Sequence, residues 1–308
     1  MNVSSLFCFY IMNEQKINKG PRDQLFLIGM VASMFCWGLS WASGKILTEY
    51  GNPVTIAFYR FLLTFISMVF LVLFLKENFS IKRRGFIDLA GAAGCLSFYT
   101  FLFFKGLSSG KAGAGGVLVT VLNPIISYVI MLIRNKRFPD KKESLGLFIG
   151  LLAGMILLNV IQNGLNLYSA GNLYFVMASL TWAFLSIFTS KSSHHGSPVI
   201  FSFYMYGIGA VVMFALADFS NVTQVLYKSD LIFIINLIFS ATITTAIATT
   251  FYFYATSRIG PSRASSFIFL VPFSAALGGW LFLSEIPQLH TIIGGLLGMV
   301  AVYVLNRK

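Results

Sequence analysis

Long apolar runs alternate with short polar segments along almost the whole chain. Each run is roughly 20 residues long, the length that a helix needs to cross the hydrocarbon core of a bilayer. Gly51-Asn52-Pro53 and Gly260-Pro261-Ser262 are two of the turn-forming segments between the runs. The pattern predicts an all-α polytopic membrane protein with ten transmembrane helices, at residues 25–43, 53–75, 86–104, 112–133, 144–161, 171–190, 198–217, 231–254, 264–283 and 289–305.

The second half of the chain repeats the first at an offset of about 145 residues. The matching segments are Trp37-Gly38-Leu39 with Trp182-Ala183-Phe184, Asn52-Pro53-Val54 with Ser197-Pro198-Val199, and Gly150 and Gly154 with Gly294 and Gly298. Five spans per half is an odd number, so the second half enters the membrane in the opposite orientation and the two halves form inverted repeats. We predict an N-terminal tail over 1–23, a first repeat over 24–162 and a second over 170–306.

Composition and charge favour a chain embedded in lipid. Hydrophobic residues make up 57% of the chain and charged residues 10%, whereas a soluble domain carries about 25% charge. The net charge of +12 lies in short loops, so nucleic-acid binding is not expected. Of the 22 Lys and Arg, 17 lie at one set of span ends, and only Lys45, Lys105, Lys111 and Lys228 lie at the other. This asymmetry places both termini, the 1–23 tail included, in the cytoplasm of a multi-pass protein in the cell's inner membrane.

The start of the chain allows two interpretations. Residues 3–12 are apolar but too few to span a membrane, and no basic residue precedes them. A signal peptide needs a positive start and a cleavage site, and neither is visible. The segment is either a small hydrophobic tail or the result of a misassigned start, with Met12 rather than Met1 as the first residue.

Several segments resemble the EamA family of the drug/metabolite transporter superfamily. They are Phe35-Cys36-Trp37-Gly38, Tyr59-Arg60-Phe61-Leu62-Leu63, Asn123-Pro124 and Val271-Pro272, and the resemblance covers about residues 24–306. It implies a monomeric ten-helix solute transporter whose central cavity is lined mainly by spans one, three, four, six, eight and nine. The family carries amino acids, nucleotide-linked metabolites, sugars and drugs, so the resemblance does not name a substrate.

Arg60 is the only charged residue well inside a predicted span. It lies seven residues after Pro53, roughly 10 Å along the helix, where an unpaired charge costs at least ~2.5 kcal/mol. Arg60 either attracts anions near the outer mouth or is structural, binding helix-end carbonyls or snorkelling outward, and we favour the structural interpretation. Lys45 and Lys105 allow the same choice between attracting anions and acting as solvated flanking residues, and we favour the latter.

Aromatic and amide side chains gather on the spans that would line the cavity. Trp37 and Trp41 are four apart and share a helix face, and Trp182 repeats Trp37. Such walls suit an organic solute held by stacking and a few hydrogen bonds. The predicted substrate-binding residues are Trp37, Trp41, Tyr99, Asn123, Trp182, Tyr252 and Tyr254. For each aromatic residue alone, ordinary packing or a place in an interfacial aromatic belt remains the alternative.

Proline and threonine add two further expectations. Pro124 and Pro272 lie inside the fourth and ninth spans, where proline kinks a helix and frees a carbonyl. We therefore predict that both help gating helices to bend. Thr242, Thr244, Thr245, Thr249 and Thr250 crowd the eighth span; they either line a polar path or bond their own helix carbonyls.

These features favour a carrier that moves a small organic metabolite by alternating access, with an aromatic or apolar amino acid as the leading substrate class. No Asp or Glu occupies a span centre, which argues against proton-driven export of hydrophobic cations. No cofactor, metal site or catalytic constellation is expected, and no ATP-binding motif is present. The expected partners are a small solute and lipid. A multidrug or other metabolite efflux carrier, or less favoured a lipid scramblase, is the alternative.

Overall fold

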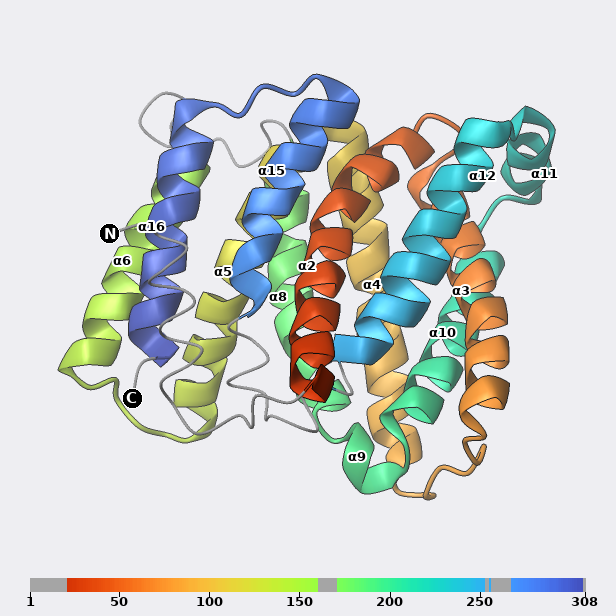
Figure 1. The fold of residues 1–308 in the computed structure, drawn as a ribbon, viewed down its shortest axis with the longest axis horizontal. Coiled ribbons are helices and arrows are strands. Elements are labelled where there is room, and N and C mark those ends of the chain that lie inside the picture. Colours follow the sequence, from red (N-terminus) through yellow and green to blue (C-terminus); the bar gives the residue numbers. More distant parts are fainter. Residues whose placement is uncertain (1–20, 160–170, 253–254, 256–266, 307–308) are drawn as a thin grey trace.

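A computed structural model describes residues 21–159, 171–252, 255 and 267–306. Within these ranges the regular secondary structure is entirely helical (Figure 1). The elements are α2 (Pro21–Leu47), α3 (Pro53–Leu75), α4 (Gly85–Ser109), α5 (Ala112–Arg134), α6 (Lys141–Leu157), α8 (Asn172–Thr189), α9 (Ser192–His195), α10 (Pro198–Leu216), α11 (Phe219–Lys228), α12 (Leu231–Ile238), the π-helix η2 (Phe239–Thr249), the 3₁₀ turn η3 (Phe267–Phe269), α15 (Leu270–Leu283) and α16 (Leu289–Asn306).

Every predicted span overlaps a helix of the structure. In the part of the chain that the structure describes, seven helices are long and apolar enough to cross a membrane, and α15 and α16 are shorter apolar helices. Large apolar side chains face outward on the bundle; Phe74 and Ile87, for example, are each 82% exposed. The protein is therefore an all-helical polytopic membrane protein, whose outer surface is suited to lipid.

Two details of the predicted spans differ in the structure. The span at 231–254 is not one uniform α-helix, because α12 runs into the π-helix η2. The span at 264–283 contains an α-helix that begins only at Leu270, after the turn η3. Pro272 is thus in the first turn of α15, where its missing N–H removes no bond from the helix interior. It marks a junction between two helix types, whereas Pro124 lies inside α5, as expected.

Local capping explains where several helices begin. Asn52 accepts a hydrogen bond from the Thr55 amide, and Pro53 follows it as the first helical residue of α3. Ser197 and Pro198 repeat this arrangement at the start of α10. Proline is favoured at this position because its missing N–H would have no helical partner. The sequence repeat at Asn52 and Ser197 is therefore a repeat of helix starts.

Helices from the first half of the chain pack against helices from the second half. The largest contacts join α6 to α16, α4 to α8, α2 to α15 and α3 to α10. In Figure 1, α6 and α16 form one end of the row, and α3, α10 and α12 form the other. Between them stand α2, α4, α5, α8 and α15. The two halves are thus interleaved along the bundle instead of forming separate bodies.

Gly38 permits the closest approach between α2 and α15. A Cβ atom at Gly38 would lie 1.9 Å from the Ser274 Oγ and 2.7 Å from the Ala275 backbone nitrogen. We expect Gly38→Ala to lower the free energy of unfolding by about 1–3 kcal/mol, because the backbone of α15 must move. Gly94→Ala is the matched control, since a Cβ there meets nothing within 4 Å. Reversible thermal or denaturant unfolding in detergent measures both; equal stability of the two variants would contradict this packing.

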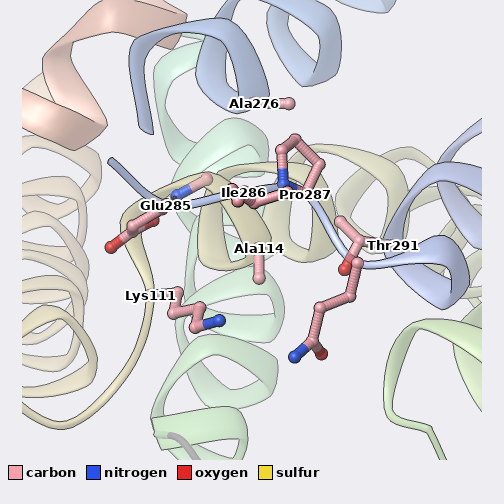
Figure 2. A pocket seen from close by; sticks show the side chains of 9 residues that line it. Lys111, Ala114, Ala276, Glu285, Ile286, Pro287 and Thr291 are labelled. Atoms are coloured by element: carbon pink, nitrogen blue, oxygen red, sulfur yellow. Dashed lines mark hydrogen bonds between the residues drawn. The ribbon is translucent and has the colours of Figure 1, made fainter. Parts of the chain in front are cut away.

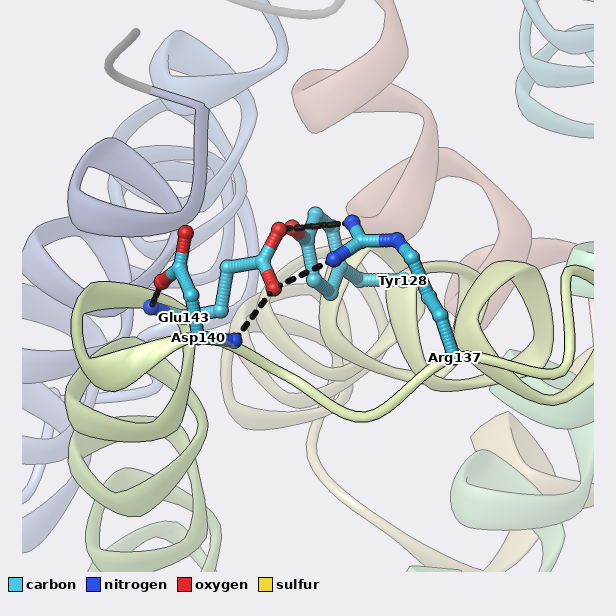
Figure 3. Close-up of polar contacts among 4 residues, drawn as sticks. All are labelled: Tyr128, Arg137, Asp140 and Glu143. Carbon is cyan, nitrogen blue, oxygen red and sulfur yellow. Dashed lines mark hydrogen bonds and ion pairs between the residues drawn. The ribbon is translucent and has the colours of Figure 1, made fainter.

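At the end of the bundle that carries α9, polar contacts join helices and loops. Asp88 of α4 pairs with Lys191 at 2.7 Å and with the His195 Nε2 at 2.9 Å. Figure 3 shows a second group at this end, where the Arg137 guanidinium donates two hydrogen bonds to the Glu143 carboxylate, at 2.6 and 2.7 Å. The same carboxylate accepts from Tyr128 and from the Asp140 amide. These bonds fix the turn between α5 and α6.

Glu143 gives this turn a pH dependence. The hydrogen bonds from Arg137, followed by those from Tyr128 and the Asp140 amide, lower the pKa of Glu143 from 4.5 to about 2. Because the folded-state pKa is depressed, the stabilisation is present above pH 4.5 and is lost as the pH falls toward 2. We expect Glu143→Gln to lower the melting temperature at pH 6 and to differ less from the native protein at pH 3. A melting difference that is unchanged between the two pH values would contradict this assignment.

Candidate functional site

A cavity lies at the centre of the bundle, between helices of both halves. Its walls come from α2, α3, α4 and α5 of the first half and from α8, α10, η2, η3 and α15 of the second. Its volume is about 110 Å³, and on the same measure a single water needs about 10–15 Å³. The space therefore suits a small organic solute.

Most of the predicted site residues line this cavity. Those that do are Trp37, Trp41, Tyr99, Asn123 and Trp182, together with Arg60 and Pro124. Tyr252 does not line it, but its ring lies 5.0 Å from that of Trp37. Tyr254 falls outside the described residues. Pro272 adjoins the cavity through its neighbour Val271, which lines the wall.

Three aromatic rings from three helices meet on one side of the cavity. Trp182 of α8 lies 4.7 Å from Tyr99 of α4 and 6.2 Å from Trp37 of α2, both measured between ring centroids and both edge-on. Edge-to-face contacts at these distances are favourable and fix the ring planes. Trp41 lies deeper: it is 4% exposed and packs against Phe103 and Phe175. Trp41 thus forms a rigid floor, and the other three rings form a wall that a solute can touch.

Arg60 brings a positive charge to the part of the cavity wall formed by α3. Its guanidinium donates a hydrogen bond to the Thr245 Oγ1 at 3.1 Å. It also lies over the rings of Phe103 and Phe104, at 5.3 and 5.8 Å from the centroids, in a cation–π arrangement. Arg60 lines the solute space, and no helix-end carbonyl accepts a hydrogen bond from it in the described ranges. The attraction of anions by Arg60 stays a prediction.

Two of the five threonines, Thr245 and Thr249, both line the cavity and bond carbonyls of their own helix. Thr245 and Thr249 donate to carbonyls five residues earlier, Ser240 at 2.7 Å and Thr244 at 3.1 Å, a spacing that follows from the π-helical turn. Their oxygens also accept from cavity residues. Trp37 donates its indole N–H to the Thr249 Oγ1 at 3.1 Å, as Arg60 does to Thr245. This π-helix therefore orients both a ring and the charge.

Asn123, which precedes Pro124, adds a polar side chain to the part of the cavity wall formed by α5. The Asn123 Oδ1 accepts a hydrogen bond from the Ser127 Oγ at 3.2 Å. This leaves the amide nitrogen of Asn123 without a hydrogen-bond partner among the described residues. Since Asn123 lines the cavity, its N–H₂ group can donate to a solute.

Tyr206 of α10 is a cavity residue that sequence reasoning missed. It lines the same space as Arg60, and its ring lies 5.9 Å from that of Phe61. The signal that identifies it is the repeat: Tyr206 follows Phe61 by the same 145 residues that separate Trp37 from Trp182. In both pairs the two corresponding side chains touch.

Two other hollows do not suit a solute site. The first, shown in Figure 2, lies between Lys111, Glu285 and Thr291 and measures only about 20 Å³, which is room for about one water. The second lies on the outer surface between α5 and α6 and is lined mostly by apolar residues such as Ile133 and Phe138, 71% and 93% exposed. Its lining also includes Lys136 and Arg137 of the turn between α5 and α6, so it is a feature of the outer surface.

The small hollow borders a clasp formed by Glu285 and the N-terminus of α5. The two Glu285 carboxylate oxygens accept hydrogen bonds from the amides of Ala112 and Gly113, each at 2.9 Å. A negative charge is favourable there because the helix dipole is positive at that end. Figure 2 shows Glu285 and its loop lying against this helix. The contact joins the α15–α16 loop of the second half to the first half.

Lys45 closes the same end of the bundle. It was expected to be a solvated flanking residue, but its ammonium donates to the carbonyls of Leu107 and Gly110. These are orphan acceptors at the C-terminus of α4, which a cation satisfies well. The expectation for Lys45 was therefore wrong. With Glu285, it fixes the α4–α5 loop at this end of the bundle.

The fold and the cavity together define a polytopic membrane protein with an internal solute-sized space. Comparison with known families gives the more specific result. The sequence pattern of the EamA-like transporter family matches residues 24–160 and 169–307. The chain belongs to this family.

Individual relatives are distant but align over most of their length. The chain is 22% identical to the uncharacterized transporter YoaV of Bacillus subtilis, over 90% of this chain and 95% of that one. It is 21% identical to a probable amino-acid metabolite efflux pump of Salmonella typhimurium, over 87% and 90%. A solved crystal structure superimposes with a TM-score of 0.58 at 16% identity, over 90% of this chain and 96% of that one. The last comparison shows a similar fold.

Proposed function

We propose that this protein is a secondary carrier that moves a small organic metabolite across the cell's inner membrane by alternating access. The observation that carries the proposal is the central cavity, whose wall joins three aromatic rings, an amide and one guanidinium from both halves of the chain. Such a site binds an organic solute without a catalytic group. A monomer is sufficient, since the cavity is enclosed within one chain, and no enzymatic activity is proposed.

Inverted five-helix repeats account for the packing. If each helix of the first half corresponds to one 145 residues later, the contact of α2 with α15 corresponds to that of α8 with α5. In the same way, the contact of α4 with α8 corresponds to the contact of η2 with α2. All four contacts are extensive. The paired rings Trp37–Trp182 and Phe61–Tyr206 agree with a pseudo-two-fold axis through the cavity. Transporters of this plan rock one repeat against the other around a fixed site.

An aromatic or apolar amino acid is the proposed substrate class. The aromatic wall matches an apolar side chain, and the Asn123 amide and the Tyr99 and Tyr206 hydroxyls match polar backbone atoms. The name of the Salmonella relative, an amino-acid metabolite efflux pump, points the same way. No carboxylate is among the described cavity residues, so we propose that the solute gradient or an exchanged solute drives transport.

Exchange in proteoliposomes tests the proposal. Vesicles holding the purified protein are loaded with unlabelled phenylalanine, leucine or tryptophan and then exposed to the same labelled amino acid. We expect saturable accumulation of label that requires internal substrate. Accumulation no faster than in protein-free vesicles, for these solutes and for a wider metabolite panel, would contradict the proposal. Labelled lipid and a cationic dye are tested in parallel, because lipid flipping would indicate a scramblase and dye efflux a multidrug carrier.

A further inference from the structure

Arg60 is the one ionised side chain among the described residues that line the central cavity. Asp and Glu are missing from the described lining. In the described ranges, the ion pairs are Arg137 with Glu143 and Asp88 with Lys191 and His195, and all lie away from the cavity. No carboxylate among the described residues therefore neutralises the positive charge of Arg60.

The contacts that Arg60 does make orient its guanidinium but leave most of its donors free. A guanidinium has five N–H donors, and one hydrogen bond, to Thr245, is formed in the described ranges. The rings of Phe103 and Phe104 attract a cation through their faces but carry no net charge. A cation held at this depth in a membrane is costly unless hydrated or paired. An anion that enters the cavity recovers that cost.

We propose that Arg60 binds the carboxylate of the transported solute. The substrate class is then an organic acid with an aromatic or branched apolar body, zwitterionic amino acids included, and organic cations are excluded. Planar guanidinium and carboxylate groups pair through two parallel hydrogen bonds. The apolar body of the solute then lies against the rings of Trp37, Tyr99 and Trp182, which line the same cavity. This inference rests on the proposed function and adds to it the group that selects the charge of the solute.

Matched acids and amides test the role of Arg60 in binding. Calorimetry on purified protein compares 3-phenylpropionate with 3-phenylpropionamide, which have the same shape and differ in charge. We expect the native protein to bind the acid about 10- to 100-fold more tightly than the amide, as a charge-assisted hydrogen-bonded pair would give. Arg60→Gln is expected to bind both with similar affinity. Arg60→Lys keeps the charge without the planar fork, so it should retain a weaker preference for the acid.

Lys105→Gln is the matched control, because it removes a cation that does not line the cavity, and it should keep the full preference. A purely structural Arg60 would weaken acid and amide binding equally. Equal binding of acid and amide by the native protein, or a preference that persists in Arg60→Gln, would overturn the inference and leave the proposed function standing. Failure of every acid, amide and amino acid to bind the native protein would overturn both. If Arg60→Gln does not fold, Arg60→Lys and the native acid-to-amide ratio still decide the outcome.

Discussion

Replacing Trp182 by alanine is expected to lower solute affinity about 10- to 100-fold. Trp182 touches Tyr99 and Trp37 at the same time, so its indole holds together the aromatic wall. Its removal takes away a large stacking surface and lets the two remaining rings rotate into the space. The change in affinity corresponds to about 1.4–2.8 kcal/mol. Binding calorimetry or substrate exchange in proteoliposomes measures it.

Trp280→Ala is the matched control for Trp182. It removes the same side chain from α15, at a position that is 54% exposed on the outer surface of the bundle. Its affinity is expected to remain within about twofold of the native value. Trp182→Phe keeps an aromatic ring and should recover part of the loss, which separates stacking from misfolding. Equal affinities for Trp182→Ala and Trp280→Ala would show that the ring wall does not bind solute.

Removing the Glu285 carboxylate should loosen the end of the bundle that Lys45 also closes. Glu285→Ala removes the two oxygens that accept hydrogen bonds from the amides of Ala112 and Gly113. It also removes a negative charge from the N-terminus of α5. We expect a loss of about 2 kcal/mol in the free energy of unfolding. We also expect faster hydrogen exchange at these two amides, measured by mass spectrometry. Glu285→Gln, which keeps one acceptor, should show roughly half of the effect.

Glu49→Gln serves as the control for Glu285, since Glu49 is an exposed carboxylate at the same end of the bundle. The corresponding acid of the first half behaves differently: Asp140, 145 residues before Glu285, caps its own helix α6. The two ends of the bundle are thus held by different contacts. We expect Glu285→Ala to make the cavity easier to reach from the Glu285 end. Unchanged exchange at Ala112 and Gly113 would show that the clasp does not hold this end closed.

Helix positions were predictable because they depend on local information. Apolar length sets where a span lies, and residues such as Asn52, Pro53 and Asp140 set where a helix begins. The central aromatic residues were predictable for a second reason, the repeat, which marked Trp37 and Trp182 as corresponding positions. The same offset would have identified Tyr206 had it been applied to Phe61.

The remaining features depend on tertiary contacts that no local pattern encodes. The π-helix η2 is recognisable only from its five-residue hydrogen bonds, since the run of threonines is equally consistent with an α-helix. Lys45 was taken for a solvated residue because its acceptors, Leu107 and Gly110, lie more than 60 residues away. Glu285 likewise binds the amides of Ala112 and Gly113, more than 170 residues away along the chain.

The central claim is that solute reaches one cavity from both sides of the membrane. A single cysteine at Thr120, which lines the cavity, is introduced after Cys8, Cys36 and Cys95 are replaced, with a cysteine at the fully buried Ala93 as the unreactive control. Membrane-impermeant maleimide is then applied from each side in turn. We predict labelling of the Thr120→Cys variant from both sides, slowed in each case by saturating solute. Labelling from neither side, or from one side alone whatever the solute, would contradict alternating access to this cavity.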